Sequence, residues 1–92
     1  MAVLSDGEIQ ERLGAAEGWG LDGDSLRKQF EFDDFKGSVD FVNRITAPAE
    51  EMNHHPDLTI SWNKVTVSLS THSQGGITES DFELARKIDE QA

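Results

Sequence analysis

Three histidines are the residues of this chain whose types and spacing best suit proton transfer. His54 and His55 are adjacent and precede Pro56, and His72 is the third histidine of the chain. Among side chains, the imidazole has the unperturbed pKa closest to neutral pH, so a cluster of histidines favours general acid–base chemistry. Whether the three rings form one site depends on the elements that carry them.

The proline indicates where the histidine pair lies. A residue that precedes a proline avoids helical backbone angles, so we expect His54 and His55 at the C-terminal end of a helix or in the loop just beyond it. A cationic imidazole there could simply complement the negative end of the helix dipole. This interpretation and a functional one are both compatible with the position of the pair.

A hairpin after the pair would bring His72 back toward it. Alternating apolar residues predict strands at 58–62 and 64–69, joined by a tight turn near Asn63. Because a hairpin returns its end toward its beginning, the loop after the second strand should lie close to the histidine pair. We expect the hydroxyl side chains of this loop to surround the same opening; they are Ser70, Thr71 and Ser73.

Glu50 could support the histidines. It lies four residues before His54, on the same side of the helix if that helix continues past Pro48. A carboxylate beside an imidazole orients the ring and stabilises its protonated form, which suits a general acid. Proline removes a backbone donor and clashes one turn back, so a kink or an irregular last turn is expected at Pro48.

Other kinds of catalytic site fit the sequence less well. Adjacent histidines project in different directions, and the i, i+4 spacing of helical metal ligands is missing from the histidine pattern, which disfavours a metal site. The chain has no cysteine, which excludes thiolate catalysis and thiolate metal sites. No serine lies in a Gly-x-Ser-x-Gly elbow, so a nucleophilic triad is not indicated.

Composition limits the partners. The chain carries 18 acidic and 8 basic residues, a formal net charge of −10, which disfavours nucleic acids and anionic membranes as partners. No apolar stretch approaches the roughly 20 residues that cross a bilayer, and residues 1–5 lack the features of a signal peptide. We expect a cytoplasmic protein whose partners are small molecules or other proteins.

Three helices are predicted. Ser5 and Glu8 fit a capping box for a helix over about 6–16, and a last helix begins after Thr78. Asp33-Asp34 offers the N-cap of the longest helix. Apolar residues recur along that helix at spacings of three and four: Phe35, Val39, Val42, Ile45, Ala49 and Met52.

The elements assemble into one predicted domain over residues 1–92. Extended pieces at 19–21 and 25–32 form a first hairpin, so the order is α-β-β-α-β-β-α. We expect an α+β fold, a four-stranded antiparallel sheet covered on one face by helices. Its far face or an open edge strand could serve self-association. Trp19 and Trp62 are expected to pack in the core rather than line a pocket.

These residues together resemble the pterin-4a-carbinolamine dehydratases. The shared pattern is Glu50-x-x-x-His54-His55-Pro56, then Trp62, His72 and Asp81 after five, nine and eight intervening residues. Further segments match in register, so the resemblance extends from Gly18 to the C-terminus: Gly18-Trp19, Lys28-Gln29-Phe30-Glu31-Phe32, Asn63-Lys64-Val65 and Ser70-Thr71-His72.

The resemblance implies a fold and an activity. Members of the family have a four-stranded antiparallel sheet with helices on one side, assemble as homodimers or homotetramers, and use no metal or organic cofactor. They dehydrate 4a-hydroxytetrahydropterin, the by-product of aromatic amino acid hydroxylases, to quinonoid dihydropterin. The implied substrate is therefore a pterin, and a functional link to such a hydroxylase follows.

The resemblance also implies residue roles. His54, His55 and His72 would be the acid–base and pterin-positioning residues, and we hypothesise that His55 and His72 carry most of the proton transfer. Glu50 would give electrostatic support. Asp81 would support the site, although it equally fits a capping carboxylate of the last helix. Residues that would line the pterin pocket are Pro56, Ser70, Thr71 and Ser73.

A different class of function is the alternative. Relatives on this scaffold also act as dimerisation cofactors or assembly factors for other proteins. Loss of the signature histidines would favour such a non-enzymatic, protein-binding role. This chain keeps all three, which favours the enzyme.

Overall fold

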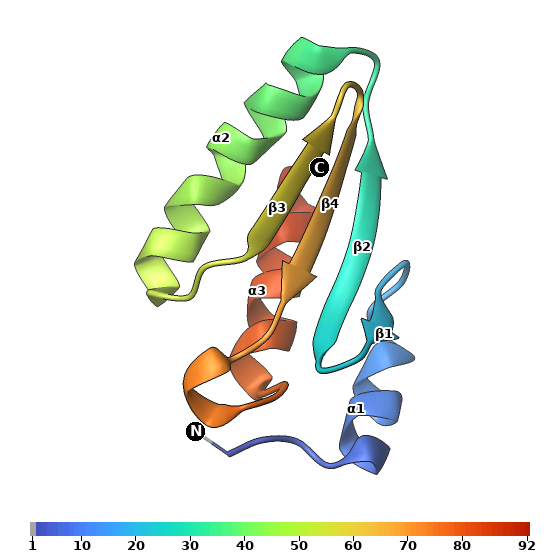
Figure 1. Cartoon of the computed structure of the whole chain (residues 1–92), viewed down its shortest axis with the longest axis vertical. Helices are drawn as coiled ribbons and strands as arrows, with labels where there is room; N and C mark the ends of the chain where they lie inside the picture. The colour runs from blue at the N-terminus through green and yellow to red at the C-terminus, as the bar shows by residue number, and fades with distance from the viewer. Residues whose placement is uncertain (1) are drawn as a thin grey trace.

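A four-stranded antiparallel sheet packed against helices forms the protein (Figure 1). The structure is a computed structural model and describes residues 2–92. The elements are α1 (Asp6–Leu13), β1 (Gly20–Asp22), β2 (Ser25–Glu31), α2 (Phe35–Met52), β3 (Asp57–Ser61), β4 (Lys64–Leu69), the 3-10 turn η1 (His72–Gln74) and α3 (Glu79–Gln91). The predicted α+β order of helices and strands is confirmed.

Two hairpins meet in the middle of the sheet. The strand order is β1-β2-β4-β3, and the central pair aligns Leu26 with Leu69 and Phe30 with Val65. These residues face the helices, whereas Arg27 and Gln29 alternate with them and are exposed on the other face. The sheet residues and the helices bury one core, whose largest members are Phe41, Leu26, Ile45, Leu69, Leu84 and Ile88.

Helices α1 and α2 begin at the capping residues that the sequence predicts, but α1 ends earlier than expected. Ser5 and Glu8 make the predicted capping box of α1, and the Asp34 side chain accepts the Gly37 N–H as the N-cap of α2. Helix α1 ends at Leu13 instead of residue 16, because Gly14 caps it and the following N–H groups bond to carbonyls three residues back in tighter turns.

Helix α2 differs from the prediction in two respects. It continues through Pro48 to Met52, so its last turn is helical and not irregular. Its buried stripe includes Phe41, while Phe35 at its first turn is 55% exposed. The sequence pattern assigned Phe35 to the apolar face, but a residue in the first turn lies beyond the end of the core.

The outer strand β3 is the main departure from the expected core. Its residues are all exposed, and Trp62, predicted to be buried, is 68% exposed. Register places Ile60 opposite the buried Val65, but β3 lies at the edge of the sheet. Trp62 lies in the hairpin turn with a positive φ of 52°. The hydroxyl of the buried Ser38 donates a hydrogen bond to the Trp62 carbonyl at 2.8 Å and holds the turn against α2.

Lys28 interrupts the apolar row of β2 and connects three parts of the fold. Its Nζ contacts Asp89 Oδ1 of α3 at 2.8 Å and the Glu17 carbonyl at 3.0 Å, and it lies 4.8 Å from the centre of the Phe30 ring. Asp89 also accepts the indole N–H of Trp19, which is buried as expected. This half-buried cluster attaches α3 to the first hairpin.

Asp89→Ala should lower the free energy of unfolding by about 2 kcal/mol, because it leaves a half-buried ammonium and an indole N–H without an acceptor. Asp40→Ala is the matched control. Asp40 pairs with the exposed Lys36 one helical turn away, so its loss should cost less than about 0.5 kcal/mol. Urea denaturation measures both; equal losses would contradict the account of this cluster.

Candidate active site

The end of α2 sets the directions of the adjacent histidines. Asn53 adopts a left-handed conformation with φ of 49°, which asparagine tolerates better than most residues. The His54 N–H bonds to the Ala49 carbonyl and the Asn53 N–H to the Glu50 carbonyl, the pattern of a Schellman motif. The backbone therefore terminates the helix by itself, and both imidazoles contact carboxylates instead of capping it.

His54 turns inward to a buried carboxylate. Its Nε2 lies 2.5 Å from Asp81 Oδ1, and Asp81, in the first turn of α3, is fully buried. The His54 side chain itself is only 14% exposed. This contact connects the end of α2 to the beginning of α3, so His54 has a structural contact that the sequence pattern did not predict.

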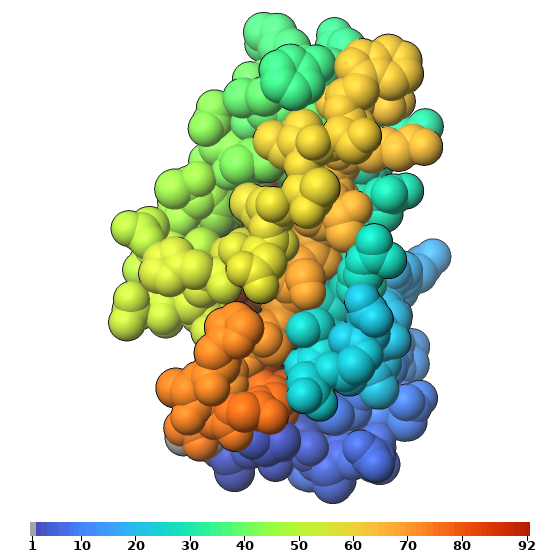
Figure 2. All heavy atoms as spheres, in the orientation of Figure 1, coloured from blue at the N-terminus to red at the C-terminus, as the bar shows by residue number. Residues whose placement is uncertain are grey.

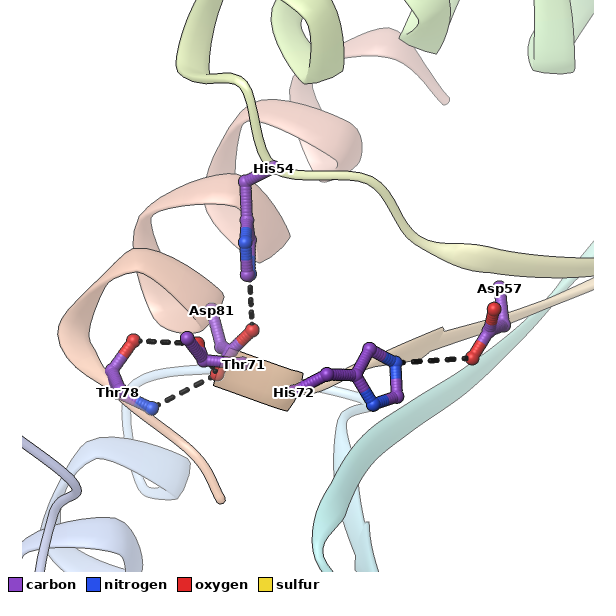
Figure 3. A network of polar contacts seen from close by, with 6 residues as sticks. All are labelled: His54, Asp57, Thr71, His72, Thr78 and Asp81. Atoms are coloured by element: carbon purple, nitrogen blue, oxygen red, sulfur yellow. Dashed lines mark hydrogen bonds and ion pairs between the residues drawn. The ribbon is translucent and has the colours of Figure 1, made fainter. Parts of the chain in front are cut away.

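The loop after β4 completes the surroundings of Asp81. Asp81 Oδ2 accepts the Thr71 hydroxyl and the Thr78 backbone N–H, both at 2.9 Å. The Thr71 and Thr78 hydroxyls lie 2.8 Å apart. Figure 3 shows these residues converging on Asp81 from three segments. Asp81 thus combines the two predicted roles, since it caps α3 through Thr78 and also supports a signature histidine.

His55 takes the opposite direction and remains exposed. Its Nε2 pairs with Glu50 on the last turn of α2. Glu50 was expected beside His54; it contacts His55 because the left-handed Asn53 redirects the chain after the helix. Both side chains are more than half exposed.

A shallow groove of about 170 Å³ lies next to this pair. It runs between the C-terminal half of α2 and the start of β3, and its walls are largely apolar. Its lining residues are Val42, Ile45, Thr46, Ala49, Glu50, His55, Pro56 and Leu58. The predicted pocket residue Pro56 is therefore found in the wall of a groove, with the polar atoms of His55 and Glu50 close by.

His72 lies at the start of η1 and faces a third carboxylate. Its Nε2 is 3.9 Å from Asp57 Oδ2, and both side chains are nearly four-fifths exposed. Figure 3 shows His72 directed toward Asp57. The expected hairpin return is present, since β3 begins beside the end of β4 with Asp57 opposite Ser68. Sequence reasoning missed Asp57, although the same hairpin argument leads to it.

The predicted hydroxyl residues separate into different environments. Ser70 is half-buried at the end of β4, and Ser73 is exposed within η1. Thr71 points inward to Asp81 and Thr78 rather than toward an opening. Each imidazole therefore has its own carboxylate, and the three rings do not share one contact.

No other kind of centre emerges from residues 2–92. In this part of the chain no group of three or more histidine, aspartate or glutamate side chains is placed to hold a metal ion. Within the same residues, no helix combines the length and apolar character needed to cross a membrane. The chemistry that the arrangement offers is hydrogen bonding and proton transfer by imidazoles oriented by carboxylates.

Comparison with known proteins identifies the family of this chain. The family described as Pterin 4 alpha carbinolamine dehydratase matches residues 2–91. A Sulfolobus acidocaldarius protein named "Putative pterin-4-alpha-carbinolamine dehydratase" is 53% identical over 92% of this chain and 93% of its own. A Thermosynechococcus vestitus protein of the same name is also 53% identical, over 92% of this chain and 90% of its own.

Solved structures show the same fold. A transcriptional coactivator/pterin dehydratase from Brucella melitensis superposes with a TM-score of 0.93 at 37% identity, covering 98% of each chain. A pterin dehydratase-like protein, identified as a RuBisCO assembly factor in the alpha-carboxysome, shares the fold with a TM-score of 0.65 at 23% identity over 80% of this chain and 86% of that one. This chain belongs to the pterin 4 alpha carbinolamine dehydratase family.

Proposed function

We propose that this protein dehydrates 4a-hydroxytetrahydropterin to quinonoid dihydropterin and so recycles the pterin cofactor of an aromatic amino acid hydroxylase. The observation that carries the proposal is the pairing of every signature histidine with a carboxylate, two of the pairs at the surface. Membership of the family supplies the substrate class.

The reaction requires two proton movements and no redox step. A proton is delivered to the 4a-hydroxyl, the C4a–O bond breaks, and water leaves. A proton is then lost from the adjacent ring nitrogen, which forms the C=N bond. Two positioned imidazoles can perform these transfers, each contributing on the order of 10²- to 10⁴-fold.

Exposure divides the histidines into two groups. His55 and His72 are exposed and can reach a substrate, so we assign most of the proton transfer to them. Glu50 and Asp57 orient their rings. His54 is almost enclosed and contacts Asp81, which suits positioning of the site better than exchange of protons with a mobile ligand.

Replacing His55 or His72 by alanine should lower kcat for dehydration by roughly 100-fold or more. Both side chains are exposed, so the free energy of unfolding should change by less than about 0.5 kcal/mol. Stopped-flow measurement of 4a-hydroxytetrahydropterin dehydration gives the rates.

Glu50→Gln should reduce the same rate less severely, because the His55 ring loses a charged partner. Glu51→Gln, at the exposed neighbouring position, is the control and should retain full activity. Wild-type rates in both the His55→Ala and the His72→Ala variants would overturn the assignment of proton transfer to these two histidines.

His54→Ala should instead destabilise the fold. It leaves one oxygen of a fully buried carboxylate without its donor, a loss of about 3 kcal/mol in the free energy of unfolding. His54→Gln retains an N–H donor and should recover part of this loss. Urea denaturation tests the pair, and a His54→Ala variant as stable as wild type would show that the Asp81 contact contributes little.

We also propose that the protein forms a homodimer through β3. Leu58 and Ile60 are more than one-third exposed on an outer strand whose outer backbone groups face no other strand of residues 2–92. Figure 2 shows β3 (yellow) uncovered along the face between α2 and β4. The β3 strand of a second copy can pair antiparallel with this one. Such pairing provides hydrogen-bond partners for the outer backbone groups of β3 and buries Leu58 and Ile60. A homotetramer would require a further interface.

Ile60→Lys should convert the dimer to a monomer in sedimentation equilibrium, because a charge would be buried against the second copy. Thr59→Lys is the control, since Thr59 lies on the opposite face of the same strand and should leave the dimer intact. A wild-type protein that sediments as a monomer at all concentrations would refute the dimer.

The second candidate function is a non-enzymatic role in protein binding or assembly. The exposed rings of Trp62 and Phe35 favour it, as do the names of the two similar solved structures. The two functions can be separated on one preparation of the protein, by testing whether it captures partner proteins and whether it accelerates dehydration. Partner binding without acceleration of dehydration would favour the second.

A further inference from the structure

A closed polar cluster surrounds Asp81. His54, Thr71 and Thr78 all contact it, and Thr78 and Asp81 are fully buried. The cluster joins the end of α2, the loop after β4 and the first turn of α3. Its hydrogen atoms can be assigned from the chemistry of its members, because only some of these groups can donate.

The assignment begins at the Thr78 backbone N–H. An N–H can only donate, and an ionised carboxylate can only accept. Asp81 Oδ2 therefore accepts the Thr78 N–H and the Thr71 hydroxyl. A hydroxyl has one proton, so Thr71 has none left for Thr78, and the Thr78 hydroxyl must donate to Thr71. The Thr71 hydroxyl thus has its only proton committed to the cluster.

The same reasoning reaches His54. Its Nε2 lies 2.5 Å from Asp81 Oδ1. Because a carboxylate can only accept, Nε2 must be the donor, so a neutral ring carries its proton on Nε2 and Nδ1 remains an acceptor. We propose that Thr71 and Thr78, acting through Asp81, are positioning residues that hold His54 in the Nε2–H form and leave Nδ1 as the acceptor of the ring. Thr71 then does not bind the pterin, in contrast to the role implied by the family resemblance.

The proposal makes a specific statement about Asp81→Asn. Two donors at the Oδ2 position require the amide oxygen there, so the amide NH₂ would face His54. An NH₂ group donates, and the His54 ring would have to accept with Nε2 and move its proton to Nδ1. The substitution should therefore invert the tautomer while it preserves the shape of the side chain.

Long-range ¹H–¹⁵N correlation spectra of the ¹⁵N-labelled full chain, recorded at a pH at which the ¹⁵N shifts of His54 are those of a neutral ring, test this directly. The wild-type His54 should show the Nε2–H pattern, and Asp81→Asn the Nδ1–H pattern. Asp89→Asn is the control, since Asp89 is another α3 carboxylate with an N–H partner, and should leave His54 unchanged. A wild-type Nδ1–H tautomer, or no inversion in a folded Asp81→Asn, would overturn the proposal.

Thr71 supplies a kinetic test that rests on the proposed dehydratase function. Thr71→Val should lower kcat by about tenfold, the scale of one hydrogen bond to a charged group, with KM unchanged, and Thr71→Ser should restore kcat. A raised KM with unchanged kcat would mean that Thr71 contacts the substrate and would refute the positioning role. The tautomer of wild-type His54 needs neither a variant nor turnover, so an inactive enzyme would refute the proposed function alone.

Discussion

The buried carboxylate of Asp81 is the constraint on which the site depends. A charge removed from water is tolerated only when donors replace its hydration. Asp81 obtains them from the end of α2, the loop after β4 and its own helix. None of these segments can shift alone without leaving a buried acceptor unsatisfied. The need of the Asp81 carboxylate for hydrogen-bond donors therefore fixes the loop that carries His72 relative to the segment that carries His54 and His55.

This constraint gives the three histidines different properties. His54 is committed to the buried carboxylate, so the chain after it must continue outward, and His55 reaches the surface beside Glu50. His72 directly follows Thr71, which is anchored to Asp81, and so it projects from a fixed point on a short turn. An acidic protein thus supplies each imidazole with a carboxylate while it leaves two of the rings accessible.

Local signals predicted the fold, and the errors arose where tertiary position decides the outcome. Ser5, Glu8 and Asp34 cap helices as expected because capping depends on neighbouring residues alone. Alternation predicted β3 correctly, but it does not distinguish an edge strand from a central one, so Trp62 was wrongly placed in the core. The helical spacing predicts Glu50 beside His54, but Glu50 pairs with His55, because the left-handed conformation of Asn53 redirects the chain after the helix. The family pattern identified the histidines, and only the packed loop revealed how Thr71 and Thr78 enclose Asp81.

The central claim is that the paired imidazoles catalyse loss of water from a 4a-hydroxytetrahydropterin. The most direct measurement is stopped-flow observation of that dehydration with and without the purified wild-type chain. The account predicts formation of quinonoid dihydropterin that accelerates in proportion to protein concentration and saturates with substrate. A rate equal to the spontaneous dehydration at every protein concentration would contradict it.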